Sequence, residues 1–432
     1  GYPVLWLAGF GVLALLAAAT LAAWELYRRR HLRLPTGFGF YLLLLLVVLL
    51  SGAMLSEHAP GTLPHESGIG RYLAFGLRLA NYASAGVLLL FIGNLTEEEL
   101  PTRKVVRWLS ALFVTTALGG LAGLLLPPVQ IPTPARFLLP GSLVSNGFMK
   151  QLVTVTFAQW QTVLGEQTTP RPSAPFVFTN TWGNMLSLLL PWFLVGAVLW
   201  ACSRWRRYLA IGLLALTVLP VIYSLNRGLW LGLIAATGYV LFRLARRGDK
   251  RPLLVGLAAA GAAGVLIVST PLSTVITGRV ENPHSNDRRG SIASASVDAA
   301  RHSPFIGYGG QLSMPGSERS IAIGPSPNCP KCGNREVGGE GQLFLLLVST
   351  GFVGTGCYVL FFLRFWWRYR TDSSPVGIAG AVAWLLTLIY LPVYASVGMP
   401  LAVTMVGLGL WWRHAEAAAS APAGLRPAAV GS

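Results

Sequence analysis

The chain has 432 residues, of which 53% are hydrophobic and only 11% carry a charge. A soluble protein of this length would have about 25% charged residues, so the composition excludes an ordinary soluble enzyme. The formal net charge of +17 would suit a nucleic acid, but 19 of the 33 Lys and Arg residues lie in short clusters between apolar stretches. Because this pattern orients membrane proteins, we expect no nucleic-acid partner.

Apolar stretches long enough to cross a bilayer recur along the whole chain. We predict eleven spans, at residues 3–24, 38–55, 72–93, 108–127, 183–201, 208–223, 229–243, 252–271, 341–363, 376–394 and 399–412. An additional helix before the first residue would place both ends in the cytoplasm. The predicted fold class is therefore all-α, a polytopic transmembrane helical bundle of about 11–12 spans with one large extracytoplasmic loop.

The basic clusters all fall on one face if each stretch crosses the bilayer once. They lie at residues 28–33, 103–107, 204–207, 243–251, 364–370 and 413. Lys and Arg are enriched in cytoplasmic loops, so this face is predicted to be cytoplasmic. The first residue then lies outside the cytoplasm and the C-terminus inside it.

This topology divides the chain into six parts. Residues 1–127 hold the N-terminal transmembrane helices, and 128–182 form an extracytoplasmic loop that partly re-enters the bilayer or lies on its surface. Central transmembrane helices occupy 183–272, and a large extracytoplasmic loop at 273–339 is predicted to be catalytic. C-terminal transmembrane helices at 340–413 precede a disordered cytoplasmic tail at 414–432. A loop as long as 273–339 is usually functional or disordered, and the helical composition of 291–301 indicates that part of it folds.

Arginines near the outer ends of two spans are candidates for binding an anion. Arg78 lies within the third span, with Arg71 just before it and Asn81 nearby. A charge at this depth usually faces a cavity or a partner, so we expect a polar cavity, with a buried ion pair as the alternative. Arg227 follows another span in the sequence SLNRGLW (224–230), on the face where basic residues are rare. This position favours an anion-binding role over a snorkelling anchor, and Gly228 allows close backbone approach.

The large loop contains further candidates. Arg288 and Arg289 precede the predicted helix, and Arg301 and His302 end it. Guanidinium groups bind phosphate oxygens bidentately, which suits a diphosphate, although solvated surface charges are the alternative. Glu340 lies where the loop enters the membrane. A carboxylate partly removed from water can rise in pKa and act as a base near neutral pH, whereas a helix-capping role is the alternative.

The cysteines indicate no metal centre. Cys329 and Cys332 lie close together in the large loop, but zinc would need two more ligands and no suitable pair follows. On an oxidising face, a local disulfide between them is the preferred prediction, with a redox-active pair as the alternative. We expect no metal and no cofactor.

Four blocks of the sequence resemble the bacterial O-antigen ligase and O-antigen polymerase superfamily of polytopic glycosyltransferases. FTNTWGN at 178–184 is similar to its aromatic-Asn segment, and SLNRGLWL at 224–231 to its Ser-Arg-Gly motif, with Asn226 in the place of the serine. PFIGYG at 304–309 is similar to its Pro-x-x-Gly-x-Gly turn. EGQLFLLLVSTGFVG at 340–354 keeps the spacing of a helix that opens with His-Asn and ends in Gly-x-x-Gly. The resemblance covers roughly residues 178–363.

One departure concerns the base. The superfamily's His, which takes the proton of the acceptor hydroxyl, falls at Glu340 here, and its Asn falls at Gly341. Glutamate can transfer the same proton, with a different pH dependence. The alternative bases are His284, His302 and Asp287.

The resemblance implies glycosyl transfer, without a metal, on the outer face of the bacterial cytoplasmic membrane. The implied partners are a polyprenyl-diphosphate-linked glycan donor, an acceptor glycan or lipid-linked glycan, and membrane lipid. Glu340, Arg227 and Arg289 are the implied catalytic residues. Further implied contacts to the diphosphate or glycan come from Arg78, Arg288, Arg301, His302, Asn184 and Tyr308.

Two other functions fit parts of the sequence. A peptidoglycan polymerase of the shape, elongation, division and sporulation kind has a similar membrane plan and donor, but the 224–231 and 304–309 blocks favour the ligase and polymerase group. A transporter or lipid flippase would more often have repeated halves with broken helices, whereas here the halves are dissimilar. The sequence does not separate a polymerase from a ligase.

Overall fold

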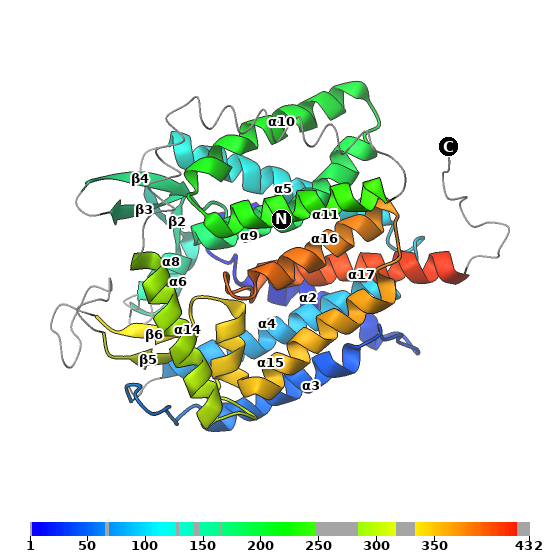
Figure 1. The fold of residues 1–432 in the computed structure, drawn as a ribbon. Coiled ribbons are helices and arrows are strands. Elements are labelled where there is room, and N and C mark those ends of the chain that lie inside the picture. Colours follow the sequence, from blue (N-terminus) through cyan, green and yellow to red (C-terminus); the bar gives the residue numbers. More distant parts are fainter. Residues whose placement is uncertain are drawn as a thin grey trace.

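The computed structural model describes residues 2–64, 69–126, 129–141, 147–163, 166–246, 284–316 and 333–420. Most of this structure is helical, and the helices pack into one bundle (Figure 1). Six described helices are long and apolar enough to cross a membrane: Gly70–Asn94, Thr102–Leu125, Thr179–Leu199, Arg204–Tyr223, Arg227–Ala245 and Gln342–Tyr369. The predicted all-α, polytopic fold is confirmed.

The N-terminal part contains α1 (Tyr2–Ala8), α2 (Leu13–Tyr27), α3 (Phe38–Leu50) with the 3-10 turn η1 (Ser51–Met54), α4 (Ile69–Asn94) and α5 (Thr102–Leu125). The first predicted span, 3–24, is thus two helices rather than one. The chain turns at Gly9, whose φ is +86°. A Cβ at this position would lie 2.3 Å from the Thr133 hydroxyl, so glycine is needed both for the turn and for the close contact.

The segment predicted as a loop at 128–182 has short elements of its own. Strand β1 (Gln130–Pro132) pairs antiparallel with β2 (Thr154–Thr156), and β3 (Ala158–Val163) with β4 (Glu166–Pro172). Helices α6 (Pro134–Leu138) and α8 (Gly147–Leu152) lie between the first two strands. Partial entry of this segment into the bilayer stays a prediction.

The central part contains α9 (Thr179–Phe193), its π-helical continuation η2 (Leu194–Leu199), α10 (Arg204–Tyr223) and α11 (Arg227–Ala245). Helix α14 (His284–His302) follows, and it includes the helix predicted at 291–301. Strand β5 (Leu312–Met314) pairs antiparallel with β6 (Arg335–Val337). The predicted span 252–271 and the cysteine pair Cys329 and Cys332 lie outside the described residues.

Three helices complete the bundle: α15 (Gln342–Tyr369), α16 (Pro375–Tyr390) and α17 (Met399–Ser420). The tail was predicted to be disordered from residue 414. This prediction is wrong for residues 414–420, which continue α17. This stretch is rich in alanine, the best helix former. Glu416 also accepts a hydrogen bond from the Tyr369 hydroxyl at 3.1 Å, which holds the extended helix against α15.

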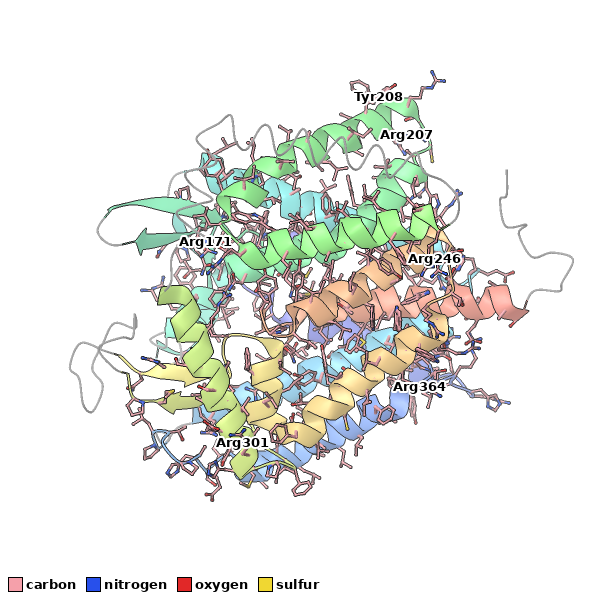
Figure 2. All side chains as sticks on the ribbon, in the orientation of Figure 1. Arg171, Arg207, Tyr208, Arg246, Arg301 and Arg364 are labelled. Carbon is pink, nitrogen blue, oxygen red and sulfur yellow. The ribbon has the colours of Figure 1, made fainter. Side chains whose placement is uncertain are left out.

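The basic clusters meet at one end of the bundle. Figure 2 shows Arg207, Arg246 and Arg364 at this basic end, whereas Arg171 and Arg301 lie at the opposite end, with the strands and α14, called the strand end below. The prediction that the clusters share one face is confirmed for these described residues.

At the basic end, arginine guanidinium groups donate hydrogen bonds to backbone carbonyls and to a few carboxylates. The Arg413 guanidinium donates to the carbonyls of Leu95 and Leu100, at 3.2 and 2.9 Å. Arg29 donates to the Glu99 carboxylate at 2.6 Å, and this hydrogen bond, together with those from Thr96, lowers the pKa of Glu99 to about 2. These contacts join the ends of α2, α4 and α17, so the clusters also fasten the helix ends together.

Helix α15 is broken at Gly351, where φ is 65° and ψ is −166°, a backbone conformation essentially restricted to glycine. The break removes the helical bonds from the N–H groups of residues 352 and 353 to the carbonyls of 348 and 349. The turn 304–309 replaces them. Tyr308 and Gly309 donate to the carbonyls of Val348 and Ser349, at 2.8 and 3.0 Å, and the Pro304 carbonyl accepts from the N–H groups of Phe352 and Val353, at 2.8 and 3.3 Å.

This exchange satisfies all four backbone groups inside the protein, as a membrane environment requires. It also explains the two glycine-containing blocks at 304–309 and 340–354. A Cβ on Gly307 would lie 2.5 Å from the Ser349 carbonyl carbon, and a Cβ on Gly351 would lie 2.5 Å from the Pro304 carbonyl oxygen. The two segments can approach this closely only because both positions are glycine.

We predict that Gly351→Ala lowers stability, because it combines a strained φ with a backbone clash. The expected loss is about 1–3 kcal/mol, measured as a lower unfolding temperature of the purified protein in detergent. Gly356→Ala is the matched control on the same helix, since nothing lies within 4 Å of a Cβ there. Equal unfolding temperatures for the two variants would contradict the role assigned to the break.

Candidate functional site

The 224–228 loop, as we call the residues before α11 together with the first two residues of that helix, lies at the strand end and carries Arg227. Leu225 has φ +50°, the one described non-glycine residue with a positive φ. The Asn226 side chain caps α11 by accepting from the Leu229 N–H at 3.3 Å. On the other side of the loop, the buried Arg171 of β4 donates from Nε to the Ser224 carbonyl at 2.9 Å. The loop is therefore held at both ends by side chains.

The α16–α17 connection, residues 391–398, packs directly against this loop. The Tyr394 hydroxyl donates to Asn226 Oδ1 at 2.5 Å. A Cβ on Gly228 would lie 2.8 Å from the Tyr394 hydroxyl oxygen and 2.5 Å from Val393 Cγ1. The close backbone approach expected at Gly228 therefore occurs, and its partner is the protein itself.

The same connection holds the start of α15, next to Glu340. Gln342 N–H donates to the Tyr394 carbonyl and Leu343 N–H to the Leu391 carbonyl, both at 2.8 Å. The Gln342 side-chain oxygen accepts from Ser396 N–H at 3.0 Å, and its Nε2 donates to the Tyr82 hydroxyl at 2.6 Å. Tyr394 therefore contacts both the loop that carries Arg227 and the helix start that follows Glu340.

Helix α14 brings Arg289 to the same place. Arg289 Nε lies 3.9 Å from Glu340 Oε2, and the side chains are 40% and 26% exposed. Two of the three predicted catalytic residues, Arg289 and Glu340, are thus an ion pair, and the loop that carries Arg227 is joined to them through Tyr394.

Other candidates on α14 lie apart from this group. Arg301 pairs with Asp298 at 3.0 Å, with both side chains more than half exposed. His302 Nδ1 lies 2.8 Å from the Asp298 carbonyl oxygen. Twelve residues of helix separate Arg301 from Arg289, which corresponds to about 18 Å along the axis, and Figure 2 shows Arg301 at the far end of α14. The Arg288 side chain lies outside the described residues.

Asn184 and Tyr308 are both buried. Asn184, on α9, donates to the Ser396 hydroxyl at 3.1 Å, so it contacts the α16–α17 connection. Tyr308 is 4% exposed and packs in a small apolar cluster with Leu312 and Val348. Burial, followed by the Glu57 charge, raises the pKa of the Tyr308 phenol. Substrate contacts by either residue stay predictions.

Arg78 was expected to line a polar cavity. In the structure, its guanidinium group instead contacts the backbone of the turn 304–309. Its Nη1 donates to the Gly309 carbonyl at 2.6 Å, while Arg71 Nη2 donates to the Tyr308 carbonyl at 3.2 Å. Both arginines therefore contact the turn 304–309 that docks into the α15 break.

Sequence reasoning missed three residues that position this site: Arg171, Gln342 and Tyr394. Arg171 carried a usable signal, because it is basic in a segment predicted to lie on the face where Lys and Arg are rare. Gln342 and Tyr394 carried none, since a glutamine at a helix start and a tyrosine at a span end are both common at membrane boundaries. Within the described ranges, no group of three or more His, Cys, Asp or Glu side chains is placed to hold a metal ion.

Comparison with known families adds one finding. Residues 212–328 match the family model described as O-antigen ligase. The resemblance to the O-antigen ligase and polymerase superfamily is confirmed. The match includes the 224–228 loop, α14 and the 304–309 turn, and it ends before Glu340. A comparison with curated proteins gave no match. The six apolar helices and this family match together support a multi-pass membrane protein. The family match supports, in general terms, a membrane ligase similar to glycosyltransferases.

We predict that Tyr394→Phe loosens the 224–228 loop, because it removes the hydroxyl donor to Asn226. Hydrogen exchange of the backbone amides at 226–230 should rise by about two- to tenfold, as expected for one lost hydrogen bond. Tyr390→Phe is the control, since this neighbouring tyrosine donates to Ser187 at 2.9 Å instead. If the two variants show the same exchange in this segment, Tyr394 does not hold the loop.

Proposed function

We propose that this protein transfers a glycan from a polyprenyl-diphosphate donor to a sugar hydroxyl of an acceptor. The proposed location is the extracytoplasmic face of the bacterial cytoplasmic membrane. The observation that carries the proposal is the meeting of Arg289, Glu340 and the 224–228 loop at the strand end, in a chain that matches the O-antigen ligase family.

The two arginines suit the donor. Arg227 and Arg289 would bind the diphosphate oxygens, because guanidinium groups match phosphate geometry and keep their charge. When the bond between the anomeric carbon and the diphosphate breaks, its electron pair goes to the diphosphate oxygen. The arginines would stabilise the negative charge that develops there, which is where electrostatic catalysis has its largest effect.

Glu340 suits the acceptor. Its carboxylate would take the proton of the acceptor hydroxyl while the hydroxyl oxygen bonds to the anomeric carbon. The products are the new glycoside, the polyprenyl diphosphate and the protonated carboxyl group. Because a diphosphate carries more negative charge than a carboxylate, it would compete with Glu340 for Arg289. Donor binding would thereby weaken the 3.9 Å ion pair and leave the carboxylate available to the hydroxyl.

We predict that Arg227→Ala and Glu340→Gln each reduce glycan transfer by about 10²–10³-fold, by analogy with the loss of one oxyanion-stabilising donor. The assay uses the purified protein in detergent with a polyprenyl-diphosphate oligosaccharide, and it separates products by chain length. Glu336→Gln is the control, because this exposed carboxylate lies on β6 at the same end of the bundle.

The products distinguish the alternatives. A ladder of longer glycans that disappears in both variants would identify a polymerase. Donor binding that depends on Arg227 without turnover would indicate a missing acceptor, and hence a ligase. Neither binding nor product would favour a transporter and contradict the proposal.

A chelator should leave the rate unchanged, since two guanidinium groups supply the positive charge that a metal ion would otherwise bring to the leaving group. The measurement compares initial rates before and after prolonged EDTA treatment, followed by addition of Mg²⁺ or Mn²⁺. A rate that falls with EDTA and returns with either ion would overturn metal-independent transfer.

A further inference from the structure

A second pair of arginines, Arg71 and Arg78, lies on α4 against the turn 304–309. They are seven residues apart, which places them two turns apart on the same face of the helix. Their guanidinium groups donate to consecutive carbonyls, those of Tyr308 and Gly309. The pair therefore forms one positively charged surface, distinct from the group of Arg289, Glu340 and Tyr394.

Most of the N–H donors of these two arginines make no hydrogen bond to the described residues. A guanidinium carries five N–H donors, and in Arg71 both Nε and Nη1 are buried without a hydrogen-bond partner. Among the described residues, neither arginine of the pair forms an ion pair, whereas others each meet a carboxylate: Arg29, Arg289, Arg301, Arg368 and Arg413. Two neighbouring cations that are partly removed from water are unfavourable unless an anion lies close to them.

The position of the pair in the membrane indicates which anion fits. Arg71 is the second residue of the candidate span Gly70–Asn94, so a bilayer crossed by this helix would place it near the level of the lipid headgroups. The next residues, Tyr72 and Leu73, are 59% and 52% exposed on the outside of the bundle. A lipid can therefore approach Arg71 from the bilayer, and the anionic group of a lipid at this depth is phosphate.

We propose that Arg71 and Arg78 form a second phosphate site, which binds the phosphate group of a membrane lipid. Tyr82, one turn beyond Arg78, accepts a hydrogen bond from Gln342 at 2.6 Å, and Gln342 follows Glu340 by two residues. A lipid held here would lie beside the helix start that carries the proposed base. If that lipid is a polyprenyl diphosphate, an assignment that rests on the proposed function, it is the carrier of the acceptor glycan.

The test counts bound lipids on the full-length protein in a phosphate-free detergent. Undecaprenyl diphosphate and phosphatidylglycerol are titrated separately, and native mass spectrometry reports how many molecules bind to each variant. Arg71→Gln and Arg78→Gln should each weaken one binding event by at least about tenfold, the loss expected for a charged hydrogen bond. Arg227→Ala should weaken a different event. Lys150→Gln, which removes an exposed charge on α8, should weaken neither.

Arg78→Gln could unfold the 304–309 turn, so Arg71→Gln carries a second measurement. A lipid that binds the folded protein raises its unfolding temperature, and this rise should be lost in Arg71→Gln and largely kept in Arg71→Lys.

Either lipid bound at the pair supports the site. Undecaprenyl diphosphate alone identifies the acceptor carrier, and phosphatidylglycerol alone identifies an ordinary phospholipid. Unchanged binding of both lipids in Arg71→Gln, with an unchanged rise in unfolding temperature, overturns the inference. The measurement needs no turnover, so lipid binding at the pair in a protein that transfers no glycan would refute the proposed function and leave this site standing.

Discussion

The break in α15 at Gly351 is the constraint on which the strand end depends. A helix that loses two backbone hydrogen bonds within a bilayer must recover them inside the protein, and here the turn 304–309 supplies both donors and an acceptor. Because this turn follows α14 almost immediately, docking it into α15 also fixes the end of α14. Arg289, near the start of α14, lies 3.9 Å from Glu340, which just precedes the same broken helix. One backbone exchange thus determines where two distant charged residues meet.

The α16–α17 connection provides the second constraint. It joins α11 to the start of α15 through Tyr394, whose hydroxyl contacts Asn226 and whose carbonyl contacts Gln342. Glycines at 183, 228, 232 and 341 make this possible, since a Cβ at any of them would come within 3 Å of a neighbouring atom. Helices that carry small residues at their contacts can approach closely in a membrane, where no hydrophobic force drives them together.

The two ends of the bundle use arginine differently. At the basic end, Arg243 donates to the carbonyl of Arg370 at the end of α15, and Arg413 donates to the carbonyl of Leu95 just after α4, which places positive charge where the helix dipole is negative. At the strand end, Arg71, Arg78 and Arg171 also donate to carbonyls, but those carbonyls belong to turns and loops. The arginines at the strand end therefore shape the turns and loops around the candidate site.

The sequence alone indicated most of the long helices of this protein and which of their ends share a face. Apolar length sets where helices cross, the clustering of Lys and Arg sets which ends share a face, and both patterns are local enough to read along the chain. It also identified Arg227 and Glu340 as candidates from their places at the membrane boundary, and Arg289 because a guanidinium group binds phosphate oxygens. Only the tertiary structure decided which of them meet. The pairing of Arg289 with Glu340, the turn that receives Arg71 and Arg78, and the bridging position of Tyr394 all depend on contacts between segments from 50 to more than 200 residues apart. Such contacts arise from the fit of whole helices, and no local pattern in the chain records that fit.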